Sequence, residues 1–428
     1  MLVKGYAGTG KTTLISELVR NLPLINQKFL LLAPTGRAAK VISAYSGRSA
    51  FTIHKIIYKL QENQDGRMQF RLQKSYQKQT IFIVDEASML SDQSSFGEKG
   101  LLGDLLEYVF AEDKGNKLIL IGDTAQLPPI GQESSSALQQ NVLQHKYRLQ
   151  VKGLELKEVV RQELNSGILF NATRLRNQLL QESPIVKFRS RGFRDFYFMG
   201  NDKMEDGLRY AYQKYGLENT IIICRSNRNA EMYNQFIRRQ LFYYENELEA
   251  GDQLMVVKNN YFYMPEDFPT GFLANGDMVS IKRIVDFEER YGFRFATLEL
   301  NLVDFPDLPA FEAKVILDTL INRAPGLDTG DQQKIYQAVL AELYEEEEEG
   351  AETKIRSHPF LNALQIKFAY AITCHKAQGG QWDAVFIDHG YFTEDMLNQD
   401  FIRWLYTAIT RASKEVYLVN FPGTFLEK

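Results

Sequence analysis

The stretch "GYAGTGKTT", residues 5 to 13, decides the fold, because it follows the phosphate-loop spacing G-x-x-x-x-G-K-[ST]. Glycines at these positions let backbone N–H groups face a phosphate, and the positive end of the next helix points to the same place. Leu2 and Val3 form a short apolar lead-in, and "TLISELVRNL" (13–22) has the periodicity of a helix. The spacing therefore predicts a strand–loop–helix nucleotide site, in which Lys11 bridges the β- and γ-phosphates and Thr12 ligates Mg²⁺.

The composition is that of a globular chain with room for several domains. Its 428 residues suffice for about two to four domains, and 44% of them are apolar. No apolar run of about 18 residues occurs and no leader precedes the first strand, so we expect neither a membrane span nor a secretion signal. Cys224 and Cys374 lie in separate apolar segments without metal-type spacing, which favours a reducing, cytoplasmic setting. The net charge of −4 argues against a basic surface all round but leaves room for a local basic groove.

Short apolar strands alternate with helical stretches in two parts of the chain. Continuous Leu, Ile and Val runs of this length suit strands that are buried on both faces of a parallel sheet. The runs are "KFLLLAP" (28–34), "TIFIVDEA" (80–87) and "KLILIGD" (117–123), and later "NTIIICRSN" (219–227), "DAVFIDHG" (383–390) and "EVYLVNF" (415–421). We therefore predict an α/β fold with two such units, one at residues 1–150 and one at 151–250 together with 360–428.

The residues between these units have a different pattern. From Gly251 to about Leu302, β-branched and aromatic runs are broken by Asn-Gly and Tyr-Gly turns, which predicts a small antiparallel barrel. Residues 310–365 look largely helical. We expect an insert at 251–359 that consists of this barrel followed by a helical segment.

The segments "IVDEASM" and "IGDTAQLPPIG" supply the second half of the nucleotide site. Asp85, at the end of an apolar strand, is placed to hold Mg²⁺ through water, and Glu86 beside it is placed to orient and deprotonate the attacking water. Gln126 follows the next strand, where a side-chain amide is able to sense a γ-phosphate. A plain polar loop at the end of the strand is the alternative for Gln126.

Eight stretches, taken in order, resemble the motifs of the superfamily 1B DNA helicases, the RecD-like and Dda-like group. They are "GYAGTGKTT", "APTGRAAK" (33–40), "TIHK" (52–55), "VDEASM" (84–89), "GDTAQLPPI" (122–130), "VVRQ" (159–162), "TCHKAQGGQWD" (373–383) and "LYTAITRA" (405–412). The resemblance implies an α/β fold with two RecA-like P-loop domains and a small SH3-like β-barrel insert. It also implies a motor that uses ATP and Mg²⁺ to move 5′ to 3′ along single-stranded DNA.

Two arginines lie far from the phosphate loop in sequence, Arg161 in "VVRQ" and Arg411 in "TAITRA". If the second α/β unit packs against the first, both are able to reach the γ-phosphate and stabilise the charge of the transition state. A surface ion pair is the alternative for each. The predicted catalytic residues are Lys11, Glu86, Gln126, Arg161 and Arg411. The predicted nucleotide-binding residues are Gly5, Gly8, Thr9, Gly10, Lys11, Thr12, Thr13 and Gly379, with Thr12 and Asp85 for Mg²⁺.

Contacts to DNA are expected in loops at strand ends, since these face the cleft in open parallel sheets. Short polar donors in "PTGRAAK", "TIHK", "CRSNRN" and "TCHKAQG" suit gripping of phosphates without reading of bases. For His54 and His375, satisfied polar packing is the alternative. The predicted DNA-binding residues are Pro34, Thr35, Arg37, Lys40, Thr52, His54, Ser226, Asn227, Thr373, His375, Lys376 and Gln378.

Residues 57–80 stand between two of these motifs. They contain an Asp65-Gly66 turn flanked by alternating residues, which predicts a hairpin. In the resembled family a strand-separating pin stands at this place in the order, so Phe70 is a candidate tip or support residue. A surface hairpin without a role is the alternative.

Two features depart from the family pattern. Relatives carry a segment ahead of the phosphate loop with a glutamine that reads adenine, whereas four residues precede Gly5 here. Gln381 stands where the family has a glutamate, so a ribose contact is not expected at that position. Either this sequence is truncated ahead of the loop, or base recognition is supplied elsewhere, for instance by Tyr6 or by residues near Arg161. We expect weak discrimination among nucleoside triphosphates.

The sequence thus predicts an ATP-dependent 5′-to-3′ DNA helicase or translocase whose partners are single-stranded DNA and duplex–single-strand junctions. The alternatives are a translocase or protein-displacing motor that does not unwind duplexes, and a nucleotide-sensing DNA-binding module. A nuclease is not indicated, because the sequence holds no separate cluster of metal-binding carboxylates. Protein partners stay unknown, and a monomer is one of the oligomeric states left open.

Overall fold

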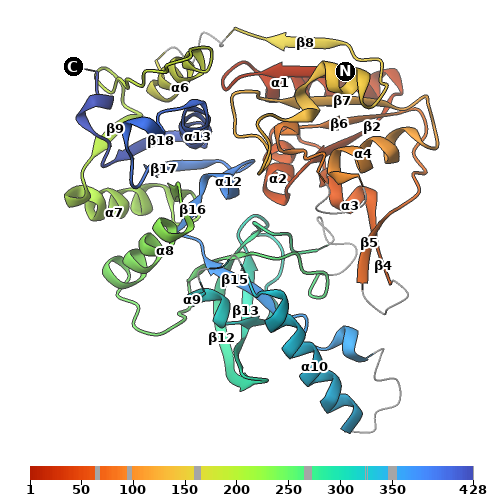
Figure 1. The fold of residues 1–428 in the computed structure, drawn as a ribbon, viewed down its shortest axis with the longest axis vertical. Coiled ribbons are helices and arrows are strands. Elements are labelled where there is room, and N and C mark those ends of the chain that lie inside the picture. The colour runs from red at the N-terminus through yellow and green to blue at the C-terminus, as the bar shows by residue number, and fades with distance from the viewer. Residues whose placement is uncertain are drawn as a thin grey trace. The chain divides into compact units, whose positions relative to one another are not determined.

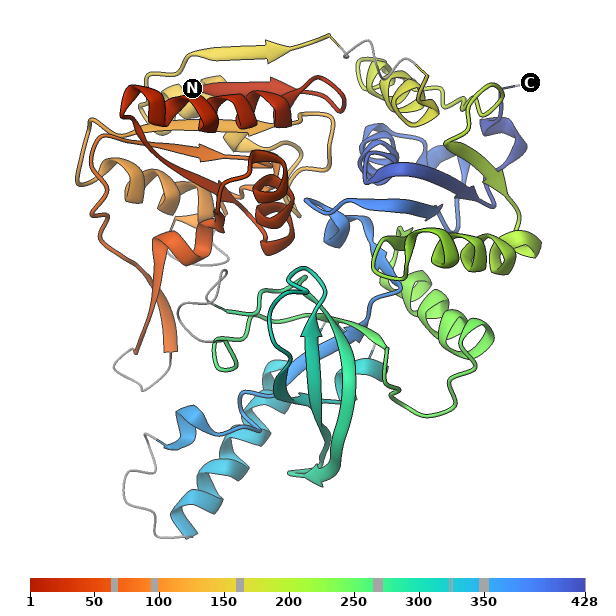
Figure 2. The ribbon, with the colours of Figure 1, turned by 180° about the vertical axis from the view of Figure 1, so that it is seen from behind.

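The computed structural model describes residues 1–62, 68–93, 99–158, 165–264, 272–322, 324, 326–345 and 354–427. These residues form two compact units, of which the first contains 1–62, 68–230 and 372–427 and the second contains 231–371 (Figures 1 and 2). Among the described helices, none combines the length and the apolar character that crossing a bilayer requires.

A parallel six-stranded sheet forms the N-terminal part of the first unit, in the strand order β3-β2-β6-β7-β1-β8. Parallel neighbours need crossover connections, and the helices between the strands supply them. The strands are β1 (Leu2–Gly5), β2 (Lys28–Ala33), β3 (Ala50–Thr52), β6 (Thr80–Val84), β7 (Lys117–Gly122) and β8 (Gly153–Leu156). The helices are α1 (Lys11–Asn21), α2 (Gly36–Ser46), α3 (Ile53–Ile57), α4 (Gly100–Phe110) and α5 (Gln140–His145).

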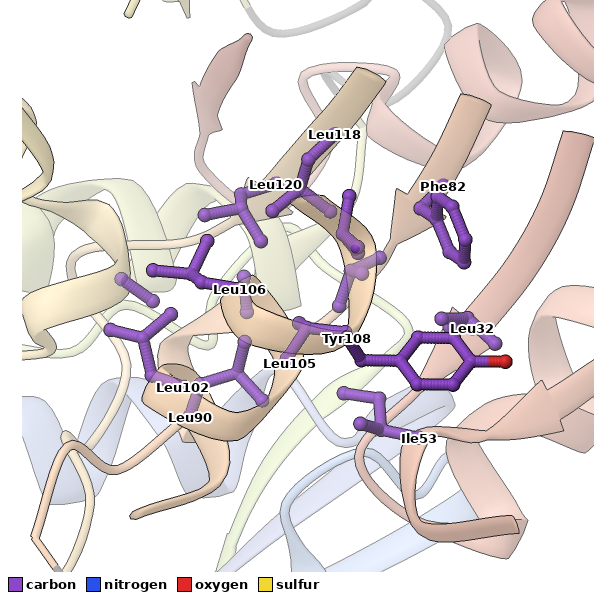
Figure 3. Packing of buried hydrophobic residues seen from close by; sticks show 14 of the residues in the cluster. Leu32, Ile53, Phe82, Leu90, Leu102, Leu105, Leu106, Tyr108, Leu118 and Leu120 are labelled. Carbon is purple, nitrogen blue, oxygen red and sulfur yellow. The ribbon is translucent and has the colours of Figure 1, made fainter. Parts of the chain in front are cut away.

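Two hydrophobic clusters cover the two faces of this sheet. Phe82 and Val84 of β6 belong to one cluster and Ile83 between them belongs to the other, as the alternation of side chains along a strand requires. Helix α4 packs into the first cluster with a helical spacing of apolar residues, Leu102, Leu105, Leu106 and Val109 (Figure 3). The continuous apolar strands are therefore buried from both sides, as their composition predicts.

The first sheet extends beyond the boundary at residue 150 that the strand pattern predicts. Strand β8 pairs with β1, in the register Val3 to Leu154. The pattern misses β8 because this edge strand is mostly exposed and contains no apolar run. Strands β4 (Tyr58–Glu62) and β5 (Met68–Leu72) pair antiparallel within the segment where the sequence predicts a hairpin. The Asp65-Gly66 turn lies outside the described residues, and the structure does not describe the side chain of Phe70 in β5.

A second sheet, with the order β16-β10-β17-β18-β9, completes the first unit. Its pairs β10–β17, β17–β18 and β18–β9 are parallel. The strands are β9 (Phe196–Met199), β10 (Thr220–Cys224), β16 (Ala371–Thr373), β17 (Trp382–Asp388) and β18 (Ala412–Val419). The helices are α6 (Gly167–Gln178), α7 (Met204–Tyr215), α8 (Asn227–Phe236), α12 (Cys374–Ala377) and α13 (Gln399–Ile409). The prediction of two RecA-like α/β domains is confirmed.

The second unit contains a closed barrel of five strands. They are β11 (Gln253–Val256), β12 (Met278–Arg290), β13 (Phe293–Leu302), β14 (Phe311–Ile316) and β15 (Leu364–Phe368), with α9 (Asp318–Ile321) and α10 (Thr329–Glu345) between the last two. The barrel is confirmed, but its extent corrects the prediction. Strand β14 lies in the segment expected to be helical, and β15 lies in residues assigned to the second α/β domain. Strands β14 and β15 are parallel, so the barrel is not wholly antiparallel, and a crossover that includes α10 joins them.

Candidate nucleotide and DNA site

The phosphate loop joins β1 to α1 and is shaped by its glycines. Gly8 and Gly10 have φ values of 74° and 82°, a backbone region that favours glycine. The Lys11 ammonium folds back on the loop, because Nζ donates to Gly5 O at 2.8 Å and to Tyr6 O at 2.9 Å. The same Nζ lies 3.9 Å from the carboxylate of Asp123. The sequence-predicted loop residues Gly5, Gly8, Thr9, Gly10, Lys11, Thr12 and Thr13 thus lie together at the N-terminal end of α1.

Asp85 and Glu86 follow β6, next to the loop. Burial and the charge of Glu86 raise the pKa of Asp85 to about 7, against the opposing charges of Lys11 and Arg411. Two adjacent carboxylates in this position favour a bound cation, because a cation relieves their repulsion. The Thr12 hydroxyl in the first turn of α1 and the Asp85 carboxylate are hard oxygen donors of the kind that Mg²⁺ binds together with phosphate oxygens. The residues therefore fit Mg²⁺ bound with a nucleotide.

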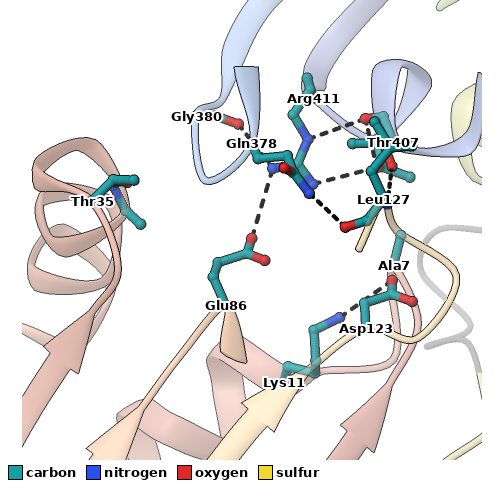
Figure 4. A network of polar contacts seen from close by, with 12 residues as sticks. Ala7, Lys11, Thr35, Glu86, Asp123, Leu127, Gln378, Gly380, Thr407 and Arg411 are labelled. Carbon is teal, nitrogen blue, oxygen red and sulfur yellow. Dashed lines mark hydrogen bonds and ion pairs between the residues drawn. The ribbon is translucent and has the colours of Figure 1, made fainter. Parts of the chain in front are cut away.

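Arg411, which lies between α13 and β18, reaches the carboxylate of Glu86 (Figure 4). Its side chain is 4% exposed, and Nη1 lies 3.7 Å from Glu86 Oε1. The Gln126 amide stands between the two groups. In the amide orientation that satisfies both neighbours, its nitrogen donates to Glu86 Oε2 at 3.3 Å and its oxygen accepts from Arg411 Nη2 at 3.0 Å. Glu86, Gln126 and Arg411, which the sequence predicts to be catalytic, therefore form one connected group.

The Arg411 guanidinium is held in place from its own side. Nε donates to Thr407 O at 3.2 Å, and Nη1 donates to Gly380 O at 3.3 Å. These bonds fix the planar guanidinium in an orientation that points at the Glu86 carboxylate, so little side-chain entropy is lost when the two groups interact. Arg161, the other arginine that the sequence predicts to be catalytic, belongs to residues 159–164, which are outside the described part of the chain.

Helix α13 makes further contacts to the first sheet that the sequence does not predict. The Tyr406 hydroxyl donates to Asp123 Oδ2 at 2.6 Å, and Thr407 Oγ1 accepts from Leu127 N at 2.8 Å. Arg403 donates to Thr124 O. A signal for these contacts exists in the spacing, because residues 403, 406, 407 and 410 form a polar stripe at helical intervals between buried apolar residues.

The DNA-binding residues predicted in the first sheet lie at the ends of β2 and β3. Thr35 and Thr52 each cap the following helix, accepting from Ala38 N and Lys55 N, both at 3.2 Å. The guanidinium of Arg37 stacks on the ring of Trp382 at 3.9 Å. Burial lowers the pKa of His54 to about 4, and its ring lies 5.7 Å from that of Tyr58. The other two predicted DNA-binding residues of this part of the chain are Pro34, which lies between β2 and α2, and Lys40, which lies within α2.

The predicted residues of the second sheet follow β10 and β16. Ser226 Oγ accepts from Asn229 N at 3.2 Å before α8, which begins at Asn227. Thr373 precedes α12, in which His375 and Lys376 lie. The Gln378 amide is buried and donates to Leu127 O at 2.7 Å, so this donor is used between the two sheets. Gly379, with φ at 74°, lies against α2, where a Cβ would be 3.1 Å from Thr35 Oγ1.

Comparisons with known proteins agree with this arrangement. Residues 1–183 match the family model described as AAA domain, and residues 368–419 match that described as UvrD-like helicase C-terminal domain. The ATP-dependent DNA helicase dda of Enterobacteria phage T4 is 26% identical over 97% of this chain and 93% of its own length. The ATP-dependent RecD2 DNA helicase of Deinococcus radiodurans is 30% identical over 30% of this chain and 16% of its own length.

Among solved structures, the fold is similar to that of a Pif1 helicase from a study of DNA unwinding at forked double-stranded DNA. That comparison has a TM-score of 0.52 and 15% identity, and it covers 100% of this chain and 90% of the other. The order of motifs, the two RecA-like domains with a barrel insert, and these relatives agree. The two family models and the full-length similarity to the dda helicase support a superfamily 1B helicase, as the order of the motifs predicts.

Proposed function

We propose that this chain hydrolyses ATP between its two RecA-like domains and uses the energy to move 5′ to 3′ along single-stranded DNA and to open duplexes. The observation that carries the proposal is the link from Arg411 through Gln126 to Glu86, because it joins a cation of one domain to a carboxylate beside the phosphate loop of the other. A motor needs such a link, since hydrolysis at one domain has to change the position of the next. The similarity to dda and RecD2 supports the same activity and DNA as the partner.

The residues have distinct roles in this proposal. When bound with the nucleotide, Mg²⁺ would neutralise phosphate charge, with Thr12 and Asp85 as the residues that hold it. Lys11 leaves its carbonyl partners, Gly5 O and Tyr6 O, to bind the β- and γ-phosphates. Glu86 takes the proton of the attacking water, and Gln126 holds the Glu86 carboxylate in orientation. Arg411 stabilises the charge that develops on the transferred phosphoryl group.

Contacts to DNA belong to the proposal too. We assign the polar groups at the ends of β2, β3, β10 and β16 to the phosphates of one DNA strand. The hairpin of β4 and β5 is assigned to the junction between this single strand and the duplex. Backbone contacts of this kind give movement that is independent of base sequence. We expect a protein that acts in the cytoplasm, and the free, buried Cys224 and Cys374 fit a reducing compartment.

The test is the rate of ATP hydrolysis with and without single-stranded DNA, followed by unwinding of duplexes that carry a 5′ or a 3′ tail. We expect stimulation by DNA and unwinding only from the 5′ tail. Lys11→Ala should abolish the stimulated rate, because it removes the charge that bridges the phosphates. Retained turnover in Lys11→Ala would refute the site. Stimulated hydrolysis without unwinding of either substrate would favour a translocase, and no hydrolysis would favour a nucleotide-sensing module.

A further inference from the structure

The backbone N–H of Ala7, in the middle of the phosphate loop, already has a partner from the other domain. It donates to the hydroxyl of Tyr406 at 2.8 Å. By contrast, the N–H of Thr9 donates within the loop, to Tyr6 O. The N–H groups of a phosphate loop that are not used within the loop face the phosphates, so the Tyr406 oxygen stands where an acceptor oxygen of a nucleotide is expected.

The Tyr406 hydroxyl is held in this position by a second hydrogen bond. It donates to Asp123 Oδ2 at 2.6 Å, and both residues are buried, each being 1% exposed. The other carboxylate oxygen of Asp123 accepts from Ala125 N at 2.9 Å, so the aspartate is itself fixed at the end of β7. A continuous chain of hydrogen bonds therefore runs from the loop N–H through the phenol to the first sheet, although the phenol comes from α13.

The chain of bonds lies at the end of the site where the terminal phosphate is expected. Asp123 is 3.9 Å from the ammonium of Lys11, the group that bridges the β- and γ-phosphates. Leu127, four residues after Asp123, is bonded through its N–H to Thr407, the neighbour of Tyr406 on α13. Gln126 between them carries the contact to Glu86, which acts on the γ-phosphate in the proposed mechanism.

We infer that the Tyr406 hydroxyl occupies the place of the terminal phosphate, so that ATP must displace it from Ala7 N–H whereas ADP need not. This inference rests on the proposed function, because it assigns ATP to the loop. Tyr406 is then a residue that distinguishes the two nucleotides: it opposes ATP until the phosphate takes over its donor, and it can return once the phosphate has left. Helix α13 transmits the difference between the ATP-bound and ADP-bound positions of Tyr406 to Leu127, through the hydrogen bond of Thr407.

The experiment compares the binding of ADP and of the non-hydrolysable analogue AMP-PNP to wild-type protein and to Tyr406→Phe, by titration calorimetry with Mg²⁺ and without DNA. A competing hydrogen bond of ordinary strength predicts that Tyr406→Phe binds AMP-PNP about 3- to 10-fold more tightly and ADP within about 2-fold of wild type. Tyr417→Phe is the matched control, because the Tyr417 hydroxyl donates to Glu415 Oε2 at 2.6 Å on the second sheet and away from the loop. We expect unchanged affinities for that variant.

Amide exchange of Ala7 gives a second measurement that does not require the variant to fold. The wild-type amide should be protected without nucleotide, and an unprotected amide would overturn the inference. An unchanged or weaker affinity of Tyr406→Phe for AMP-PNP, or an equal shift for both nucleotides, would overturn it too. Failure of the proposed function is distinguishable, since it appears in wild-type protein as hydrolysis that DNA does not stimulate, whereas failure of the inference appears in the ratio between variant and wild type.

Discussion

Replacing Arg411 by alanine tests the contact between the two domains. In the structure its guanidinium lies 3.7 Å from a carboxylate oxygen of Glu86, in a position that is 4% exposed. A unit charge on a transferred phosphoryl group at a similar distance gains about 4 kcal/mol from the guanidinium at an effective dielectric constant of about 20. This energy corresponds to a loss of about 10³-fold in kcat for Arg411→Ala, if the gain is realised in the transition state.

The assay is steady-state hydrolysis of ATP at saturating single-stranded DNA, combined with the affinity for AMP-PNP to separate binding from chemistry. Lys414→Ala is the matched control, because Lys414 is a cation on the neighbouring strand whose exposed ion pair with Asp383 contributes little. We expect its kcat within about 2-fold of wild type. The melting temperature of Arg411→Ala has to be checked, since the change removes the donor of Gly380 O and one of the two donors of Thr407 O. A kcat of Arg411→Ala within about 10-fold of wild type would refute the catalytic role.

Two further predictions concern stability. A Cβ at Gly380 would lie 2.5 Å from the Trp382 ring and 3.1 Å from Arg37 Cδ. Gly380→Ala should therefore lower the free energy of unfolding by about 1–3 kcal/mol in urea titrations. Gly423→Ala is the control, because a Cβ there would meet nothing within 4 Å, and it should change the free energy of unfolding by less than about 0.5 kcal/mol. Equal effects of both changes would contradict the packing. Burial lowers the pKa of His54 to about 4 from its usual 6.5, so the folded protein disfavours the charged ring. As the pH falls from about 6.5 towards 4, the unfolded chain protonates this histidine before the folded protein does, and the free energy of unfolding decreases. His54→Gln should therefore lose less stability than wild type between pH 7 and pH 5 in denaturant titrations, and an equal loss would mean that the ring is protonated freely when folded.

The sequence predicts the phosphate loop and the pair Asp85 and Glu86 because the relevant groups are contiguous. A loop between a strand and a helix has few backbone solutions, so glycine spacing alone determines where its N–H groups point. The apolar strand before Asp85 likewise fixes the edge of the sheet at which the carboxylates emerge. These local constraints account for the two parallel sheets as well.

Contacts made by tertiary packing are less accessible from sequence. The amide of Gln378 is predicted to contact DNA, but its partner in the structure, Leu127 O, lies in the loop that follows β7 of the first sheet, and no local spacing reveals it. Strands β14 and β15 are similar cases, since a barrel is closed by pairing between segments far apart in the chain. Tyr406 is missed for the same reason, although its place in the polar stripe of α13 carries a signal.

Arg403, Tyr406 and Thr407 all project from α13, and each contacts a different backbone or side-chain group of the first sheet. An α-helix is a stiff rod, because every turn is bonded to the next. We therefore expect a displacement of Tyr406 to strain the neighbouring bonds of Arg403 and Thr407 as well. A change of ligand at Ala7 N–H would then be felt along α13 as far as Arg403, one turn before Tyr406.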